Sequence, residues 1–297
     1  MIYDIVLRLS YSYANPATGG RHLARLIPVD LPGEQRLVGA QLDIAPAPSE
    51  RSERSDFFGN RATDFAYRGA FSKVALTVRA RVDRLVPPLH GPALLLAELP
   101  RALADVQSMG PNAPVHFRAA SPFVPLVPEV SAYALAQTRP GMTALAAVAA
   151  LGQALHRDMR YDPAATDVDT PMARAFAARH GVCQDFSHIM IAGLRSLGIP
   201  AGYVSGLLRT TPPPGKPRLE GADAMHAWVR AWCGPQAGWV DYDPTNAVFA
   251  GETHIVVARG RDYSDVSPIK GVLRVSGSQS GQHSVDVKPL TFRHGTS

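Results

Sequence analysis

The order in which strand-like and helix-like patterns follow one another constrains the fold of this 297-residue chain more than any other feature. In the first 85 residues, apolar and polar residues alternate, as in IVLRLSYSY, RHLARLIPV, LVGAQLDIAP and VALTVRARVDRLV. Clusters of Gly, Asn and Pro separate these runs. A period of two residues is typical of strands, so the pattern predicts a small N-terminal β domain over residues 1–85.

The middle of the chain is rich in proline before it becomes helical. Residues 86–140 contain PPLHGP and SPFVPLVPEV, but apolar residues persist, which predicts a connecting region with short helices rather than a disordered linker. From Thr143, TALAAVAALGQALHRDMRY has apolar residues at three- and four-residue steps, as a helix requires. A second helix is expected over PMARAFAARH, with Pro171 in its first turn and Gly181 as its stop.

A third helix is predicted to begin at Cys183, within GVCQDFSHIMIAGLRSLGIP, and to end at Gly198 and Pro200. Its apolar stripe consists of Phe186, Met190, Leu194 and Leu197. The runs AGYVSGLLR, HAWVRAW, WVDYD and HIVVARG then predict strands of one sheet, and GVLRVSGSQSGQHSVDVKPL predicts a β-hairpin. Residues 141–297 are therefore expected to form an α+β domain of helices packed on an antiparallel sheet.

Composition excludes several classes of function. The net charge is +5, but the 26 Arg and four Lys residues are spread along the chain, so we expect no nucleic-acid partner. The N-terminus, MIYDIVLRLSYSY, lacks the apolar core of a signal peptide, and no apolar run is long enough to cross a bilayer. Two cysteines are too few for a disulfide scaffold. We therefore expect a cytoplasmic protein with free thiols and no membrane partner.

Cys183 is a candidate nucleophile because of its place at a helix start. The unpaired N–H groups there and the positive end of the helix dipole favour a thiolate over a thiol. The same N–H groups could stabilise the oxyanion of a tetrahedral intermediate. The alternative is that Cys183 is only a small packing residue, since small residues are common at helix starts.

A thiol nucleophile needs a base, and His226 in DAMHAWVRAW is the candidate. It is expected at a strand start beside aromatic residues, which could hold its ring in one tautomer, although a structural role is the alternative. The run WVDYDPTN offers Asp241 and Asp243 as the carboxylate that would orient the ring. The residue pattern does not choose between them, and Asp-Pro-Thr-Asn is also a good turn sequence.

Three stretches together resemble a known family: GVCQDFSHIMIAGLRSLGIPAGYVSG, DAMHAWVRAW and GWVDYDPTN are similar to the core motifs of the transglutaminase-like superfamily. The N-terminal strands with DFFGN, and the segment ARGRDYSDVSPIKG, resemble a bacterial branch of that family. The resemblance implies a papain-like, transglutaminase-like catalytic core over residues 141–297. It also implies that Cys183 is the nucleophile, His226 the base and Asp243 the orienting acid.

The resemblance assigns no role to several neighbouring residues. Gln184, Asp185 and His188 belong to the motif of Cys183, and Cys233 is interpreted as a bystander. Animal members use calcium and further β domains, but this chain has no EF-hand-like acidic loop, so we expect no cofactor and no metal. A metal site of Cys183, His188, His226 and an aspartate is disfavoured because no second cysteine stands at a C-x-x-C spacing.

The implied chemistry is acyl transfer through a thioester. We favour hydrolysis of an amide in a peptide, a protein or a small molecule; the alternatives are transfer from a protein glutamine to an amine, and a catalytically silent binding protein. The N-terminal β domain is expected to form one wall of the substrate cleft. The loop TTPPPGKPRLEG is interpreted as a solvent loop or a rim of the site.

Overall fold

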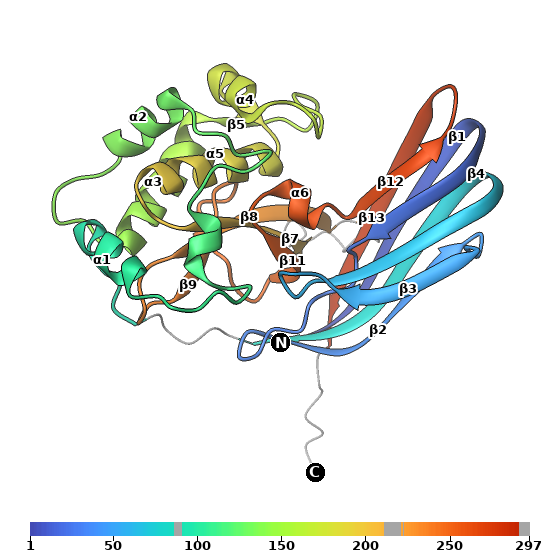
Figure 1. Cartoon of the computed structure of the whole chain (residues 1–297), viewed down its shortest axis with the longest axis horizontal. Coiled ribbons are helices and arrows are strands. Elements are labelled where there is room, and N and C mark those ends of the chain that lie inside the picture. Colours follow the sequence, from blue (N-terminus) through green and yellow to red (C-terminus); the bar gives the residue numbers. More distant parts are fainter. Residues whose placement is uncertain (86–90, 211–220, 222, 291–297) are drawn as a thin grey trace, which may run out of the picture.

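The computed structural model describes residues 1–85, 91–210, 221 and 223–290. Within these residues the chain forms two parts, each built on a sheet (Figure 1). The sheet of the first part, the N-terminal sheet, consists of β1 (Ile2–Ala24), β2 (Gln35–Ala45), β3 (Glu50–Ser55), β4 (Arg61–Arg84), β12 (Ile269–Arg274) and β13 (Gln279–Pro289).

The second part combines a sheet with helices. Its sheet contains β7 (Ala201–Leu208), β8 (Ala224–Trp232), β9 (Trp239–Asp243), β10 (Val248–Phe249) and β11 (His254–Gly260) in the order β10-β9-β8-β7-β11. Its helices are α1 (Leu99–Ala104), α2 (Pro128–Ala136), α3 (Ala144–Asp158), α4 (Met172–Ala178), α5 (Cys183–Ser196) and α6 (Tyr263–Val266). Short 3-10 helices occupy Leu96–Glu98 and Pro114–Phe117, and a parallel pair joins β5 (Arg160–Tyr161) to β6 (His180–Gly181).

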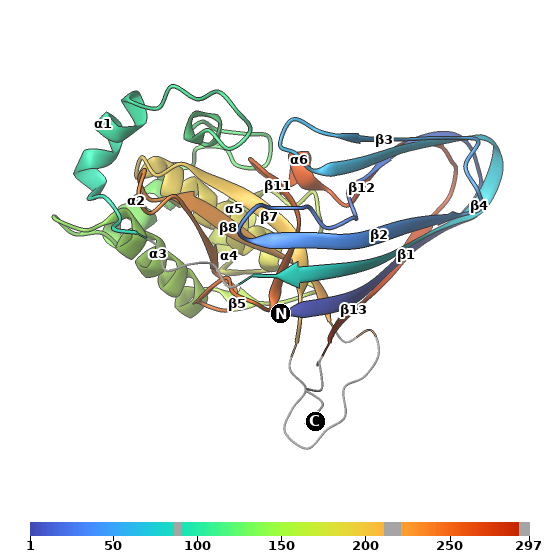
Figure 2. The ribbon, with the colours of Figure 1, turned by 90° about the horizontal axis from the view of Figure 1, so that it is seen from below.

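The N-terminal sheet is built on two very long strands. β1 and β4 pair antiparallel from Ile2 opposite Asp83 to Ala24 opposite Thr63. β2 and β3 each pair with a different half of β4, and β12 and β13 each pair with a different half of β1. Figure 2 shows β4 turning at the end of the sheet far from the helices, so the two halves of the sheet face each other. The alternating apolar residues fill the space between the halves, as the period of two predicts.

The last strands differ from the prediction. β12 and β13 both pair with β1, with Leu23 opposite Lys270 and Leu7 opposite Val285, and not with each other, so the expected hairpin is wrong. β1 is long enough to pair with both strands, β13 along its first half and β12 along its second half. The predicted catalytic domain, residues 141–297, therefore includes two strands, β12 and β13, that pair with the sheet of the N-terminal part.

The expected α+β class, with helices on an antiparallel sheet, is confirmed in the second part. α5 packs against β7 and β8 on one side and against α2, α3 and α4 on the other. Twelve of its residues are buried, so α5 is a central helix and not the one-sided amphipathic helix that the stripe suggested. Within the described ranges, no helix has the length and apolar character needed to cross a membrane.

The end of α4 also differs from the prediction. The helix stops at Ala178, and Arg179 takes the left-handed conformation with φ 58°, where Gly181 was expected as the stop. Gly181 has another role, because a Cβ there would lie 2.5 Å from the Asp185 carboxylate. The glycine therefore allows the carboxylate to approach the backbone just before Cys183.

The two parts are joined by side-chain amides that bind the edge of the second sheet. β11 is the last strand in the order, and an exposed strand edge has unpaired backbone groups. The Gln35 side chain accepts from the Val256 N–H at 2.9 Å and donates to its carbonyl at 2.7 Å. Asn60 makes the same pair of bonds with Arg259, at 2.7 and 2.8 Å. Both amides are buried, so they fix the N-terminal sheet against the second sheet.

Close packing between α3 and β9 gives a prediction of stability. A Cβ on Gly152 would lie 2.0 Å from the Tyr242 ring. Alanine gains roughly 1 kcal/mol in helix propensity over glycine, but overpacking a core costs about 1–3 kcal/mol and more for severe contacts. We expect Gly152→Ala to lower the free energy of unfolding by about 1–2 kcal/mol in urea titrations. Gly39→Ala, where a Cβ meets nothing within 4 Å, is the control; equal midpoints for the two variants would contradict the packing argument.

Candidate active site

Cys183 is the first residue of α5, as predicted, and its side chain is partly exposed. The helix start is fixed by Asp185, whose carboxylate accepts from the Val182 N–H at 2.8 Å and from the Thr166 hydroxyl at 2.6 Å. Burial raises the pKa of Asp185, and these hydrogen bonds partly offset that effect. Asp185 therefore fixes the turn that presents Cys183.

His226 and Asp243 lie together beside this helix start. His226 Nε2 is 2.8 Å from Asp243 Oδ2, and both side chains are at least nine-tenths buried. Burial lowers the pKa of His226, but hydrogen bonds with Asp243 and Cys183, and the electrostatic effect of these two groups, outweigh burial and raise it to about 10. Because Nε2 is bound to Asp243, Nδ1 is the ring nitrogen that is available to bind Cys183. The structure thus brings together the three residues that the family resemblance implied.

Asp243 accepts hydrogen bonds on both oxygens. Oδ1 accepts from the backbone N–H groups of Thr245 at 2.9 Å and Asn246 at 3.2 Å, so the Asp-Pro-Thr-Asn stretch is also a turn. Oδ2 accepts from the Asn246 side chain at 2.7 Å. Burial raises the pKa of Asp243, but its hydrogen bonds with His226, His254 and Asn246 outweigh burial and hold the pKa well below its usual range. The carboxylate is therefore ionised and held in one orientation.

His254, at the start of β11, is a residue that the sequence analysis missed. Its Nε2 lies 3.2 Å from Asp243 Oδ2, and its Nδ1 accepts from the Gly251 N–H at 3.3 Å. Because Nδ1 accepts a hydrogen bond, Nε2 is the ring nitrogen that donates to Asp243. The sequence shows only that a histidine stands at the start of a predicted strand. The pairing of β11 with β7 is what places His254 near β8 and β9, and the sequence pattern does not predict that pairing.

We expect His254→Leu to lower kcat/KM by about 10- to 100-fold, since a hydrogen bond to a charged group contributes about 1.5–3 kcal/mol. His254 lowers the pKa of Asp243, so its loss should raise that pKa and move the acid limb of the pH–rate profile to higher pH. His254→Gln, which retains a donor, should restore part of the rate. A pH profile identical to that of the wild type in His254→Leu would show that the ring does not act on Asp243.

Asp241, the other candidate carboxylate, belongs to a separate cluster. Its Oδ2 accepts from Trp228 Nε1 at 3.0 Å and lies 3.4 Å from Arg259 Nη2. Burial raises the pKa of Asp241, but the charges of Arg259 and Arg230 outweigh burial and lower it. The geometry therefore places Asp243, and not Asp241, beside His226.

The residues of the Cys183 motif without an assigned role bind neighbouring segments. Gln184 Nε2 donates to the Val168 carbonyl at 3.1 Å. His188 Nε2 accepts from the Tyr263 N–H at 3.2 Å, and burial lowers the pKa of His188 to about 4. These side chains fix two segments around the start of α5. In the part of the chain that is described, no group of three or more His, Cys, Asp or Glu is arranged to hold a metal ion.

Cys233 directly follows β8, at the opposite end of that strand from His226. It is buried, and burial raises the pKa of its thiol to about 12. A protonated, buried thiol is a poor nucleophile, which agrees with its interpretation as a bystander. The loop TTPPPGKPRLEG, interpreted as a solvent loop or a rim, lies almost entirely outside the described residues.

Comparison with known proteins extends the resemblance over most of the chain. Residues 131–244 match the transglutaminase-like superfamily, and residues 3–83 match the bacterial transglutaminase-like N-terminal region. The chain is 35% identical over 302 residues to the uncharacterized protein Rv2569c of Mycobacterium tuberculosis, covering 97% of this chain and 93% of that protein. It is 31% identical over 284 residues to the uncharacterized protein ML0607 of Mycobacterium leprae, covering 92% and 94%.

A solved structure has the same fold over almost the whole chain. It is a proposed cysteine protease from Cytophaga hutchinsonii, with a TM-score of 0.76, 19% identity, and coverage of 99% of this chain and 92% of that one. At that identity the likeness concerns the fold alone. The matches in sequence show that the chain belongs to the bacterial transglutaminase-like branch of the transglutaminase-like superfamily.

Proposed function

We propose that this protein is a thiol enzyme that acts on amide bonds through Cys183, His226 and Asp243. Membership of the transglutaminase-like superfamily supports a cysteine-dependent enzyme. The observation that carries the proposal is that Asp243 binds His226 Nε2 at 2.8 Å, while the hydrogen bonds and charges of Asp243 and Cys183 raise the pKa of His226 and favour its protonated ring. Such a pair supplies a nucleophile together with the acid that a leaving group needs.

In the proposed first step, Cys183 Sγ attacks the amide carbonyl carbon and a C–S bond forms. The Asp185 and Phe186 N–H groups donate to the Val182 carbonyl, so the N–H groups of Cys183 and Gln184, at the very start of α5, are the ones suited to hold the oxyanion. His226 donates its proton to the leaving nitrogen as the C–N bond breaks, which releases an amine or ammonia. In the second step His226 takes a proton from water, the hydroxide attacks the thioester, and a carboxylic acid leaves as the Cys183 thiolate reforms.

We favour water over an amine as the acceptor of the acyl group. Cys183 is only partly buried, so water has access to a thioester formed there. Substrates would be peptides, proteins or small amides. The chemistry needs a compartment that keeps Cys183 reduced, and the cytoplasm meets that need.

The test is to incubate the protein with blocked glutamine dipeptides and with unfolded casein, with and without a primary amine, and to identify products by mass spectrometry. The proposal predicts cleaved or deamidated products and an acyl adduct on Cys183 after rapid quenching. Amine adducts in place of acids would support transfer as the second reaction of the same thioester. Product formation that continues unchanged in His226→Ala or Cys183→Ala would contradict the proposal.

A further inference from the structure

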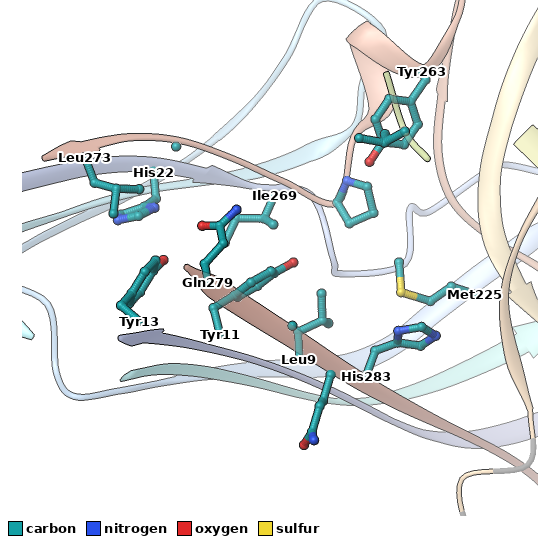
Figure 3. A pocket seen from close by; sticks show the side chains of 15 residues that line it. Leu9, Tyr11, Tyr13, His22, Met225, Tyr263, Ile269, Leu273, Gln279 and His283 are labelled. Carbon is teal, nitrogen blue, oxygen red and sulfur yellow. The ribbon is translucent and has the colours of Figure 1, made fainter. Parts of the chain in front are cut away.

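A groove of about 480 Å³ lies between the N-terminal sheet and the second part of the molecule. Leu9, Tyr11 and Tyr13 of β1 lie along it, and β12 contributes Ile269 and Leu273 (Figure 3). On the side of the second part it is lined by Val168, Met225 and Tyr263. Its volume lies in the range of small-molecule binding sites, so it is large enough for more than one side chain.

The groove is connected to the proposed reaction centre by hydrogen bonds and by chain continuity. Gln184, the residue after Cys183, binds the carbonyl of Val168. His188, on the same helix, binds the N–H of Tyr263. Met225 directly precedes His226 on β8. The helix that presents the thiol therefore also positions two residues of the groove wall.

The lining is rich in aromatic rings, and its polar groups are hydroxyls, side-chain amides and imidazoles. The described residues that line the groove include no Asp, Glu, Lys or Arg. Burial raises the pKa of Tyr11, Tyr13 and Tyr263, so their hydroxyls stay neutral, and burial lowers the pKa of His22, which favours its neutral ring. A surface of this kind binds apolar and aromatic groups and disfavours charges, which would lose part of their hydration without gaining a carboxylate, ammonium or guanidinium partner.

We propose that this groove is a substrate subsite, and that it binds an uncharged aromatic or branched aliphatic side chain near the amide that Cys183 attacks. The inference rests on the proposed function and adds the class of substrate. It also gives the N-terminal sheet a role, because β1 and β12 would form one wall of the subsite. Selectivity would come from the sheet, and reactivity from α5, β8 and β9.

Adjacent residues of β12 provide a matched pair of variants. Leu273 lines the groove, whereas Val272 points to the other face of the strand and is 81% exposed. Positional libraries of blocked hexapeptides should show a preference of at least about tenfold in kcat/KM for Phe or Leu over Asp at one position. Leu273→Asp should abolish this preference and favour Lys or Arg at that position, while Val272→Asp should retain the wild-type preference.

A binding measurement separates failure of the subsite from failure of the proposed chemistry. Fluorescein-labelled hexapeptides would be titrated against Cys183→Ala, alone and combined with either β12 variant, with thermal unfolding as the check on folding. A Phe preference that Leu273→Asp removes and Val272→Asp retains would support the subsite even if the wild type cleaved nothing. Equal peptide preferences in Leu273→Asp, Val272→Asp and their parent would overturn it, even if turnover depended on Cys183.

Discussion

We expect Cys183→Ala to lose turnover by about 10⁴-fold or more, because removing a nucleophile from a cooperating set removes nearly the whole chemical contribution of the set. The thiol forms the bond on which both proposed steps depend, so the remaining groups cannot compensate. The side chain is partly exposed, and the start of α5 is fixed by Asp185 rather than by the thiol. The variant should therefore unfold at nearly the wild-type temperature.

The measurement is kcat/KM on any substrate found in the amide assays, with a thermal melt of each protein. Cys233→Ala is the control, because it removes the other thiol of the chain. The activity per folded molecule of Cys233→Ala should match that of the wild type. If Cys183→Ala retained a tenth or more of the wild-type rate, a thioester on Cys183 could not be the main route.

We expect Asp241→Ala to produce the largest loss of stability, about 3–5 kcal/mol, because breaking a buried ion pair by removing one partner leaves uncompensated charge. Arg230 and Arg259 are buried beside Asp241, and Arg259 also binds Glu34. Burial lowers the pKa of Arg230 to about 9, and Asp241 counteracts this effect. Without Asp241, the carboxylate that the described residues still place beside Arg259 is Glu34, which is 38% exposed.

The measurement is urea unfolding at neutral pH, with Asp4→Ala as the matched control. Asp4 accepts two hydrogen bonds from Arg81, at 2.7 and 2.9 Å, but both side chains are exposed. Exposed pairs contribute about 0–1 kcal/mol, so Asp4→Ala should be close to neutral. A similar loss of stability in both variants would show that burial does not determine how much Asp241 contributes to the free energy of unfolding.

Local patterns in the sequence predict much of this fold. The strands around Leu7 and Val78 follow from alternation, and the position of Cys183 at a helix start follows from the apolar spacing and from the Gly198 stop. The strand order of the second sheet brings His226 next to Asp243, but only the resemblance to the family separated Asp243 from Asp241. Both carboxylates lie on one strand, and what distinguishes them is the neighbour that each one meets.

Contacts between distant segments could not be predicted in this way. His254 reaches Asp243 only because β11 pairs with β7, and β12 joins β1 across more than two hundred residues of sequence. Likewise, nothing in the sequence distinguishes Gln35 and Asn60 from other polar residues. Each nevertheless binds the edge of β11 with both the oxygen and the nitrogen of its side-chain amide. Such partners depend on how sheets pack, and a local pattern carries no information about that packing.

The central claim, that Cys183 is a nucleophile activated by His226, can be measured without a substrate. Iodoacetamide alkylation of Cys183 and Cys233 would be followed against pH by peptide mass spectrometry, in the wild type and in His226→Ala. We predict that Cys183 reacts rapidly even at mildly acidic pH, that Cys233 stays unreactive in the folded protein, and that His226→Ala removes the advantage of Cys183. Alkylation of Cys183 that is as slow as that of Cys233, or that is unchanged in His226→Ala, would contradict the claim.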